Sequence, residues 1–270
     1  MNRLKKYGAI LRIRFNAGIQ YRAAALAGMA TQFAWGFFSI TLYQAFYRGN
    51  PQAFPMTFQA LVSYMWLRQA FFSLFSTWNT EGQILNAITD GGIAYELARP
   101  IGIYPMWFMR HFSARISATL LRAIPLLIVT AFIPAPYGLS LPANPAAFVG
   151  FLVTLLLGAL VTAAYMMLIY VITVFTMQPQ GVRMAFNAFS ELLSGSLIPI
   201  PFFPPALARI LELTPFAAMS NVPYRVYSGD LAGAAAWQAV GLQVFWLIAL
   251  VALGAILLRQ ALRRTVIQGG

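Results

Sequence analysis

The sequence predicts an all-α polytopic membrane protein that forms a single transmembrane domain over residues 1–270 and crosses the bilayer with six helices. Three observations carry this prediction: the composition, the apolar stretches and the placement of the basic residues. Hydrophobic residues make up 60% of the 270-residue chain and charged residues only 9%. Soluble domains carry about 45–50% apolar and about 25% charged residues. The composition therefore excludes a soluble enzyme and predicts little soluble mass.

Six apolar stretches match membrane spans of roughly 20 residues each. We place them at residues 23–47, 56–78, 116–132, 147–177, 184–198 and 234–258. Pro125 lies inside the third stretch and predicts a kink there. The fourth stretch carries two pairs of small residues at i and i+4 spacing, Gly158 with Thr162 and Ala159 with Ala163. Such pairs permit close helix approach, either inside one chain or at a subunit interface.

The basic residues gather on one side of this topology. That side holds Arg3, Lys5, Lys6, Arg12, Arg14, Arg22, Arg99, Arg110, Arg115, Arg183, Arg259, Arg263 and Arg264. The opposite side holds Arg48, Arg209 and Arg225. Because cytoplasmic loops carry an excess of Lys and Arg, both termini are predicted to be cytoplasmic, in a bacterial plasma (inner) membrane. The net charge of +12 is thus explained by topology and predicts no nucleic-acid partner.

The N-terminal segment, residues 1–22, predicts an amphipathic helix lying in the inner membrane interface. Apolar residues alternate there with basic ones that suit the anionic headgroups of membrane lipids. Its basic residues are spread over the whole segment, and the first span is too long for a signal peptide, so we expect no cleavage. A plain basic tail that sets the topology is the alternative interpretation.

Several kinds of chemistry are excluded by the residue content. A phosphate-binding loop needs glycines followed by Lys and Ser or Thr, and the chain's only lysines are Lys5 and Lys6. Cysteine is absent, and His111 is the single histidine, so one chain cannot build a two-His or thiolate metal site. We therefore predict no enzyme activity, no metal site and no cofactor in this chain.

The most organised polar segment spans residues 79–111. Thr80 and Gln83 have the spacing of a capping box, which predicts a helix that starts at Thr80. Asp90 and Gly91 are expected to end this helix, and a second short helix is expected to end before Pro100. The apolar face of the first helix consists of Ile84, Leu85 and Ile88. Such an element either docks a cytosolic partner or packs on the chain's own spans.

Two further features attract attention from the residues alone. Arg68 falls about midway along the second span, where a lone arginine costs at least ~2.5–3.5 kcal/mol, and Glu191 falls at mid-depth in the fifth. We predict that they pair, as a structural lock or as part of a polar route.

Between the fifth and sixth spans, residues 199–230 begin with a proline-rich run that cannot continue a spanning helix. This segment is expected to form a partly re-entrant outer hairpin or an outer loop lying flat on the headgroups.

Three stretches carry a family resemblance: "GGIAYELARPIGIY" after the second span, "SYMWLRQAFFSLFSTW" within it and "ELLSGSLIPIPFFPPALARILELTPFAAMSNVPYRVYSGD" after the fifth. In this order they resemble one subfamily of ABC-2-type permeases, the membrane subunits of ATP-binding-cassette exporters. The first stretch matches the pattern Gly-x-x-x-x-x-Leu-x-Arg-Pro. The resembled family usually carries an uncharged polar residue where Arg68 stands.

The resemblance implies a transport function and names its partners. The chain would be the permease of an exporter and would line the translocation path. A separate ATP-binding subunit, holding ATP and Mg, would drive it through a coupling helix in the loop 79–111. A second permease chain, identical or related, would complete the path. The coupling residues implied by position are Glu81, Asp90, Gly91, Glu96, Leu97, Arg99 and Pro100. An outer gate would be formed by Pro201, Phe202, Phe203, Pro204, Pro215 and Phe216.

Two other functions remain open at this point. A self-contained secondary transporter or channel usually shows several intramembrane carboxylates or repeated halves. Here Glu191 is the only acid at mid-depth, and no internal repeat is evident. A membrane scaffold without transport also fits the composition. The substrate is not specified by any motif.

Overall fold

The computed structural model describes residues 8, 12–13, 16, 22–50 and 54–264, and every regular element in these ranges is a helix. The all-α class is thus confirmed. The predicted interfacial helix over residues 1–22 lies, apart from isolated positions, outside the described residues. The long helices are α2 (Arg22–Gly49), α7 (Ile103–Ala131), α8 (Pro145–Thr176) and α13 (Gly233–Arg264). The shorter ones are α3 (Phe58–Ala70), α4 (Phe72–Phe75), α5 (Gly82–Thr89), α6 (Ile93–Leu97), α9 (Pro179–Leu193), η2 (Ile200–Phe202), α10 (Pro205–Glu212), α11 (Pro215–Met219) and α12 (Asn221–Ser228).

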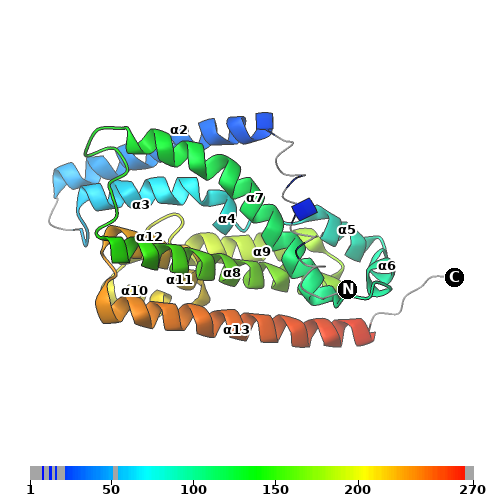
Figure 1. Ribbon diagram of the computed structural model, residues 1–270. Helices are drawn as coiled ribbons and strands as arrows, with labels where there is room; N and C mark the ends of the chain where they lie inside the picture. The colour runs from blue at the N-terminus through cyan, green and yellow to red at the C-terminus, as the bar shows by residue number, and fades with distance from the viewer. Residues whose placement is uncertain (1–7, 9–11, 14–15, 17–21, 51–53, 265–270) are drawn as a thin grey trace.

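The long helices form an elongated bundle with two different ends (Figure 1). Helices α5 and α6 lie at the end where α13 finishes, and we call this the α5–α6 end. Helices α10 and α12 lie toward the end where α13 begins, which we call the hairpin end. The arrangement separates the predicted coupling loop from the predicted outer hairpin by the length of the bundle.

Among the described residues, three helices are long and apolar enough to cross a membrane: α7, α8 and α13. The predicted second span is shorter than expected, because its helix α3 has 13 residues and is followed, after Phe71, by the four-residue α4. The predicted fifth span corresponds to α9, which has 15 residues. At 1.5 Å per residue, α3 and α9 measure roughly 20 and 22 Å, less than the ~30 Å hydrocarbon core. The count of six spans therefore stays a prediction.

Helix α7 begins well before the predicted third span, which we placed at 116–132. It starts at Ile103, inside the segment 79–111 that we expected to be a loop, and continues through Pro125. The early start is explained by burial, because Met106 and Trp107 pack in one apolar cluster with α5, α6 and α8. The first turns of α7 therefore form a wall against which the predicted coupling element rests.

Helix α8 is the centre of the core and packs against α7, α9, α11, α12 and α13. Its small residues serve this internal packing: Gly158, Ala159, Thr162 and Ala163 are all buried within the chain. A Cβ on Gly158 would lie 2.1 Å from the carbonyl oxygen of Met219 at the end of α11. Of the two roles left open by the sequence, this single chain uses close helix approach inside its own fold.

Substitution of Gly158 with alanine is expected to lower the free energy of unfolding by about 1–3 kcal/mol, because the new methyl group meets backbone atoms that must shift. Gly241→Ala on α13 is the matched control, since a Cβ there meets no atom within 4 Å. The control should be neutral or stabilising by up to ~1 kcal/mol through helix propensity. Thermal unfolding of the purified chain in detergent measures both. Equal effects would contradict the close approach of α8 and α11.

Candidate functional site

The predicted coupling segment folds into two short helices, α5 and α6, that turn one face to the bundle. On that face Ile84, Ile88 and Ile93 pack against Trp107 of α7 and Tyr170 of α8. The helix α5 ends at Thr89, and its C-cap Asp90 is followed by Gly91 with a φ of +75°, as the sequence predicted. A positive φ is adopted readily by glycine, which explains its place in the turn between the helices. The apolar face predicted from the sequence is thus confirmed as a buried one.

Glu96 lies on the buried face of α6, with 7% of its surface exposed. Its carboxylate forms an ion pair with Arg110 of α7 at 2.5 Å, and the indole N–H of Trp107 donates a hydrogen bond to the same group. Arg110 also donates to the side chain of Gln83 on α5 at 3.2 Å. Glu96 therefore fixes α5 and α6 to α7, and its buried position makes it a positioning residue rather than a contact for another protein.

The outward face of the α5–α6 element is exposed at the end of the bundle. The sequence-derived candidates exposed there are Asp90, Gly91, Leu97, Arg99 and Pro100. Tyr95, which is not among the sequence-derived candidates, is 81% exposed, more than Leu97 at 40%. The helical phase could have revealed it, because Ile93 and Glu96 share the inner face and position 95 then points outward. Tyrosine is enriched at protein interfaces, so exposed Tyr95 is a candidate contact residue.

Glu81, the remaining predicted coupling residue, marks the start of α5. It is the N-cap residue but makes no side-chain capping bond, so the predicted capping box of Thr80 and Gln83 is wrong. Its backbone N–H instead donates to the hydroxyl of Tyr170 on α8 at 2.8 Å. The same hydroxyl is 2.8 Å from Nδ1 of His111 on α7. One tyrosine thus joins the start of α5 to two membrane helices.

His111 continues this chain of hydrogen bonds to Arg115, one turn further along α7. Arg115 donates through Nε to His111 Nε2 at 2.6 Å, so the neutral imidazole carries its proton on Nδ1, facing Tyr170. Its two terminal nitrogens donate to backbone carbonyls that follow α4 or belong to it. The acceptors are Ser73, Leu74, Ser76 and Asn79, at distances of 2.6–3.4 Å. Buried Arg115 therefore secures the chain segment that connects α4 to α5.

Arg68 and Glu191, the predicted intramembrane pair, meet through a third residue. Arg68 lies in the last turn of α3 and donates to the backbone carbonyl of Ser196, while the Ser196 hydroxyl donates to Glu191 at 2.7 Å. The indole of Trp78 donates to the other carboxylate oxygen at 3.0 Å. Within the described part of the chain no direct ion pair joins Arg68 to Glu191. The direct pair was wrongly predicted because α9 ends at Leu193 and the chain then turns at Gly195, placing Ser196 between the two.

A small polar cavity of about 80 Å³ surrounds this contact. Arg68 and Glu191 line it together with residues of α4, the loop after α9 and Tyr224 of α12. Elements from both halves of the chain meet here, so a movement of α3–α4 relative to α9 would change the cavity.

The predicted outer-gate residues are divided between two helices of the bundle. Phe202 in η2 contacts Tyr43 of α2, with ring centroids 5.5 Å apart. Phe216 in α11 contacts Tyr165 of α8, also at 5.5 Å. The prolines begin or bound short elements: Pro201 lies in η2, Pro204 and Pro215 stand at the starts of α10 and α11, and Phe203 follows η2. Through these two aromatic contacts, the predicted hairpin, residues 199–230, connects α2 with α8.

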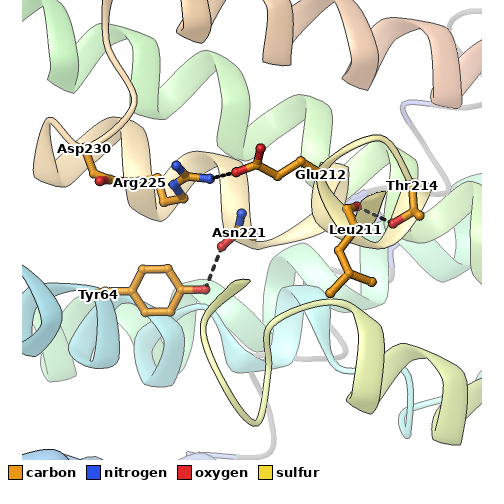
Figure 2. Close-up of polar contacts among 7 residues, drawn as sticks. All are labelled: Tyr64, Leu211, Glu212, Thr214, Asn221, Arg225 and Asp230. Atoms are coloured by element: carbon orange, nitrogen blue, oxygen red, sulfur yellow. Dashed lines mark hydrogen bonds and ion pairs between the residues drawn. The ribbon is translucent and has the colours of Figure 1, made fainter. Parts of the chain in front are cut away.

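An ion cluster that the sequence did not reveal closes this hairpin (Figure 2). Arg225 of α12 forms ion pairs with Glu212 of α10 and Asp230, both at 2.5 Å. Beside it, the hydroxyl of Tyr64 on α3 donates to the side chain of Asn221 at 3.3 Å. Arg225 is 13 residues from Glu212 and 5 from Asp230, separations that fit no helical repeat, so the turns between α10 and α12 bring the three together. They tie α10 and the end of α12 into one unit that contacts α3.

Comparison with known protein families now decides the class. A family model described as ABC-2 family transporter protein matches residues 33–269. The chain belongs to the ABC-2 transporter family. None of the curated proteins matches this sequence. The family resemblance inferred from the three sequence stretches is therefore confirmed.

Membership of the ABC-2 family identifies the chain as a membrane protein whose relatives work, in general, with an ATP-binding subunit. Among the described residues of this ABC-2 protein, no group of three His, Asp or Glu side chains is placed to hold a metal ion. The polar features of the site are instead hydrogen-bond networks between helices. They connect α5 and α6 to α7 and α8.

Proposed function

We propose that this chain is the permease subunit of an ATP-binding-cassette exporter and that a separate ATP-binding subunit drives it through the α5–α6 element. The observation that carries the proposal is the two-sided character of this element. Its inner face is fastened to α7 and α8 by Glu96, Arg110 and Tyr170, while Tyr95 and Leu97 are exposed on its outer face. A docking element needs both a contact surface and a rigid connection to what it moves.

The hydrogen bonds suggest how a push on α6 reaches the translocation path. Movement of α6 pulls on α7 through the Glu96–Arg110 ion pair. Movement of α5 reaches α8 through Tyr170, and Arg115 carries it to the segment after α4. Because α4 and Arg68 of α3 border the polar cavity, the end point of this chain of contacts is the proposed path. The coupling would be a rigid-body shift of packed elements, without chemistry in this chain.

ATP and Mg would be bound by the partner subunit, in agreement with the absence of a phosphate-binding loop from the sequence. A second permease chain and membrane lipids would cover the apolar side chains that the bundle exposes. These are prominent on α2, with Trp35 and Phe38, and on α13, with Trp237 and Ile248. We infer six spans, cytoplasmic termini and a bacterial inner membrane from the placement of the basic residues.

The hairpin segment is proposed to be re-entrant and to form the outer gate. Two observations support this. Met219 of α11 touches Gly158, which lies 13 residues, or about 20 Å, into α8 from its start at the hairpin end. The backbone then returns beside α8 until Ala143 donates its N–H to the carbonyl of Tyr227 at 3.2 Å. Broken helices at such depth are tolerated where protein groups satisfy their backbone; here Gln243 and Trp246 of α13 donate to the carbonyls of Ala218 and Leu213, both at 2.9 Å.

The proposal is tested by co-purification of the tagged chain, expressed together with its neighbouring genes, with any ATP-binding subunit that it retains. Leu97→Asp should reduce the bound subunit and its ATPase activity by about 30-fold, the effect of losing a central contact worth ~2 kcal/mol. The matched control is Leu141→Asp, in the loop before α8, where the leucine is 89% exposed. The control should bind the subunit normally. Normal binding by Leu97→Asp would reject the α5–α6 contact, and no ATP-binding subunit with the unaltered chain would favour a self-contained transporter.

A further inference from the structure

A second polar cavity, of about 220 Å³, lies between α7 and the segment that joins α4 to α5. It is far larger than the ~10–15 Å³ that a single water requires. Glu81, His111 and Arg115 of the hydrogen-bond network described above line one side of this cavity. The rest of the cavity is not filled by that network. The lining residues are Ser73, Asn79, Thr80, Glu81, His111, Ala114, Arg115, Ala118 and Arg122.

The cavity owes its shape to one stripe of α7. Arg115 and Arg122 lie on this stripe at helical spacing, with Ala114 and Ala118 beside and between them. The two alanines leave the space that larger side chains would fill. On α2, Gly28 faces the same arginine: a Cβ there would lie 2.9 Å from Arg122 Cζ. The neighbouring helix therefore provides room for the guanidinium group of Arg122.

The cavity is electropositive. Arg115 uses all its N–H groups on His111 and on backbone carbonyls, which satisfy its hydrogen bonds without cancelling its charge. In the ranges that the structure describes, Arg122 forms one hydrogen bond, from Nη1 to the Ser73 hydroxyl at 3.1 Å, and no ion pair. Glu81 is the one acidic residue among the lining residues. Two guanidinium groups thus face one carboxylate.

Arg122 lies within α7, one of the three helices long and apolar enough to span the membrane. An arginine at membrane depth without a counter-ion is costly, and such residues usually mark a binding site or a path. A phosphate group is the natural ligand for a guanidinium with free donors, since its oxygens accept parallel charge-assisted hydrogen bonds. On the face of the helix opposite Arg122, α7 exposes the apolar side chains of Leu120 and Ile124, as a helix in contact with lipid does.

We propose that this cavity binds the phosphate group of an anionic membrane lipid, with Arg122 contacting the phosphate and Arg115 supplying a fixed positive charge. The Ser73 hydroxyl, which accepts a hydrogen bond from Arg122, has a proton left to donate to a phosphate oxygen. The inference goes beyond the proposed transport function and does not depend on an ATP-binding subunit. It gives the α5–α6 end a lipid-binding site next to the segment that Arg115 secures.

The test uses the full chain purified in detergent, with thermal stability measured against added lipid. Phosphatidylglycerol should raise the melting temperature in a saturable way, and zwitterionic phosphatidylcholine should not. Arg122→Gln should weaken the apparent affinity for phosphatidylglycerol by about tenfold or more, through loss of a charge-assisted contact. Ala118→Leu fills the cavity while keeping both arginines, and should also abolish the shift. Arg209→Gln, which removes an exposed arginine of α10, is the control and should respond as the unaltered chain does.

Inorganic phosphate forms the second arm of the test. If phosphate alone reproduces the stabilisation and competes with phosphatidylglycerol, the site takes a soluble phosphate and the lipid assignment is overturned. An undiminished phosphatidylglycerol response in both Arg122→Gln and Ala118→Leu would place lipid binding elsewhere and overturn the proposal. The absence of any response in the unaltered chain would do the same. If Arg122→Gln does not fold, Ala118→Leu alone decides between these outcomes.

Discussion

Arg115→Leu is expected to lower the free energy of unfolding by about 3–5 kcal/mol, because it leaves several buried carbonyl oxygens unsatisfied, at roughly 1–3 kcal/mol each when none regains a partner. The substitution leaves the carbonyl oxygens of Ser73, Leu74, Ser76 and Asn79 without their donor. It also removes the N–H that His111 accepts and so disturbs its bond to Tyr170. Denaturant or thermal unfolding of the purified chain in detergent measures the loss.

Two control variants separate the hydrogen bonds from the charge. Arg99→Leu removes an exposed arginine at the same end of the molecule and should leave stability within about 0.5 kcal/mol. Arg115→Lys keeps the charge but offers three donors instead of five, so it should fall between the unaltered chain and Arg115→Leu. An Arg115→Leu protein as stable as Arg99→Leu would show that the carbonyl contacts do not hold the segment after α4.

Glu96→Lys is expected to have the second large effect, also about 3–5 kcal/mol, because it places two positive charges together in a buried site. Trp107 loses its hydrogen-bond acceptor at the same time, and α6 loses its attachment to α7. The variant should therefore fail to bind an ATP-binding subunit through loss of local structure. Leu97→Asp, in contrast, should fail with its stability intact.

The reciprocal exchange of the two charges distinguishes a pair from two independent residues. The double variant Glu96→Lys with Arg110→Glu should recover part of the stability lost by Glu96→Lys alone. Asp90→Lys, with the same charge change at an exposed position of the α5–α6 turn, is the control and should unfold like the unaltered chain. If the double variant loses the sum of both single effects, the Glu96–Arg110 contact contributes nothing as a pair.

Much of the fold follows from local sequence signals. Composition predicts the helical membrane class, and Asp90 with Gly91 marks the end of α5 because glycine accepts a positive φ. The apolar face of α5 was also predictable, since its spacing fits a helix. The start of α7 was not, because Trp107 and Arg110 are individually compatible with a loop, and their contacts with α6 and α5 are not visible in the local sequence.

The candidate site was predictable in position but not in detail. Glu96 and Leu97 are adjacent in the sequence. The packing of α6 against α7 determines that Glu96 is buried and Leu97 exposed. Likewise Arg68 and Glu191 were placed near each other, but the turn after α9 inserts Ser196 between them. Arg115 donates to backbone carbonyls 36 to 42 residues earlier in the chain, and Arg225 pairs with carboxylates 5 and 13 residues away across turns. No periodicity or motif records such contacts.

The central claim is that an ATP-binding subunit docks on the outer face of α5–α6. Because the chain has no cysteine, Leu97→Cys introduces a unique thiol there, to which a photoactivatable cross-linker can be attached. The control is Leu213→Cys, exposed in the hairpin segment. In membranes that hold the complete transporter, we predict that the ATP-binding subunit is cross-linked from position 97 and not from position 213. A subunit that is present but cross-linked from neither position, or equally from both, would contradict the account.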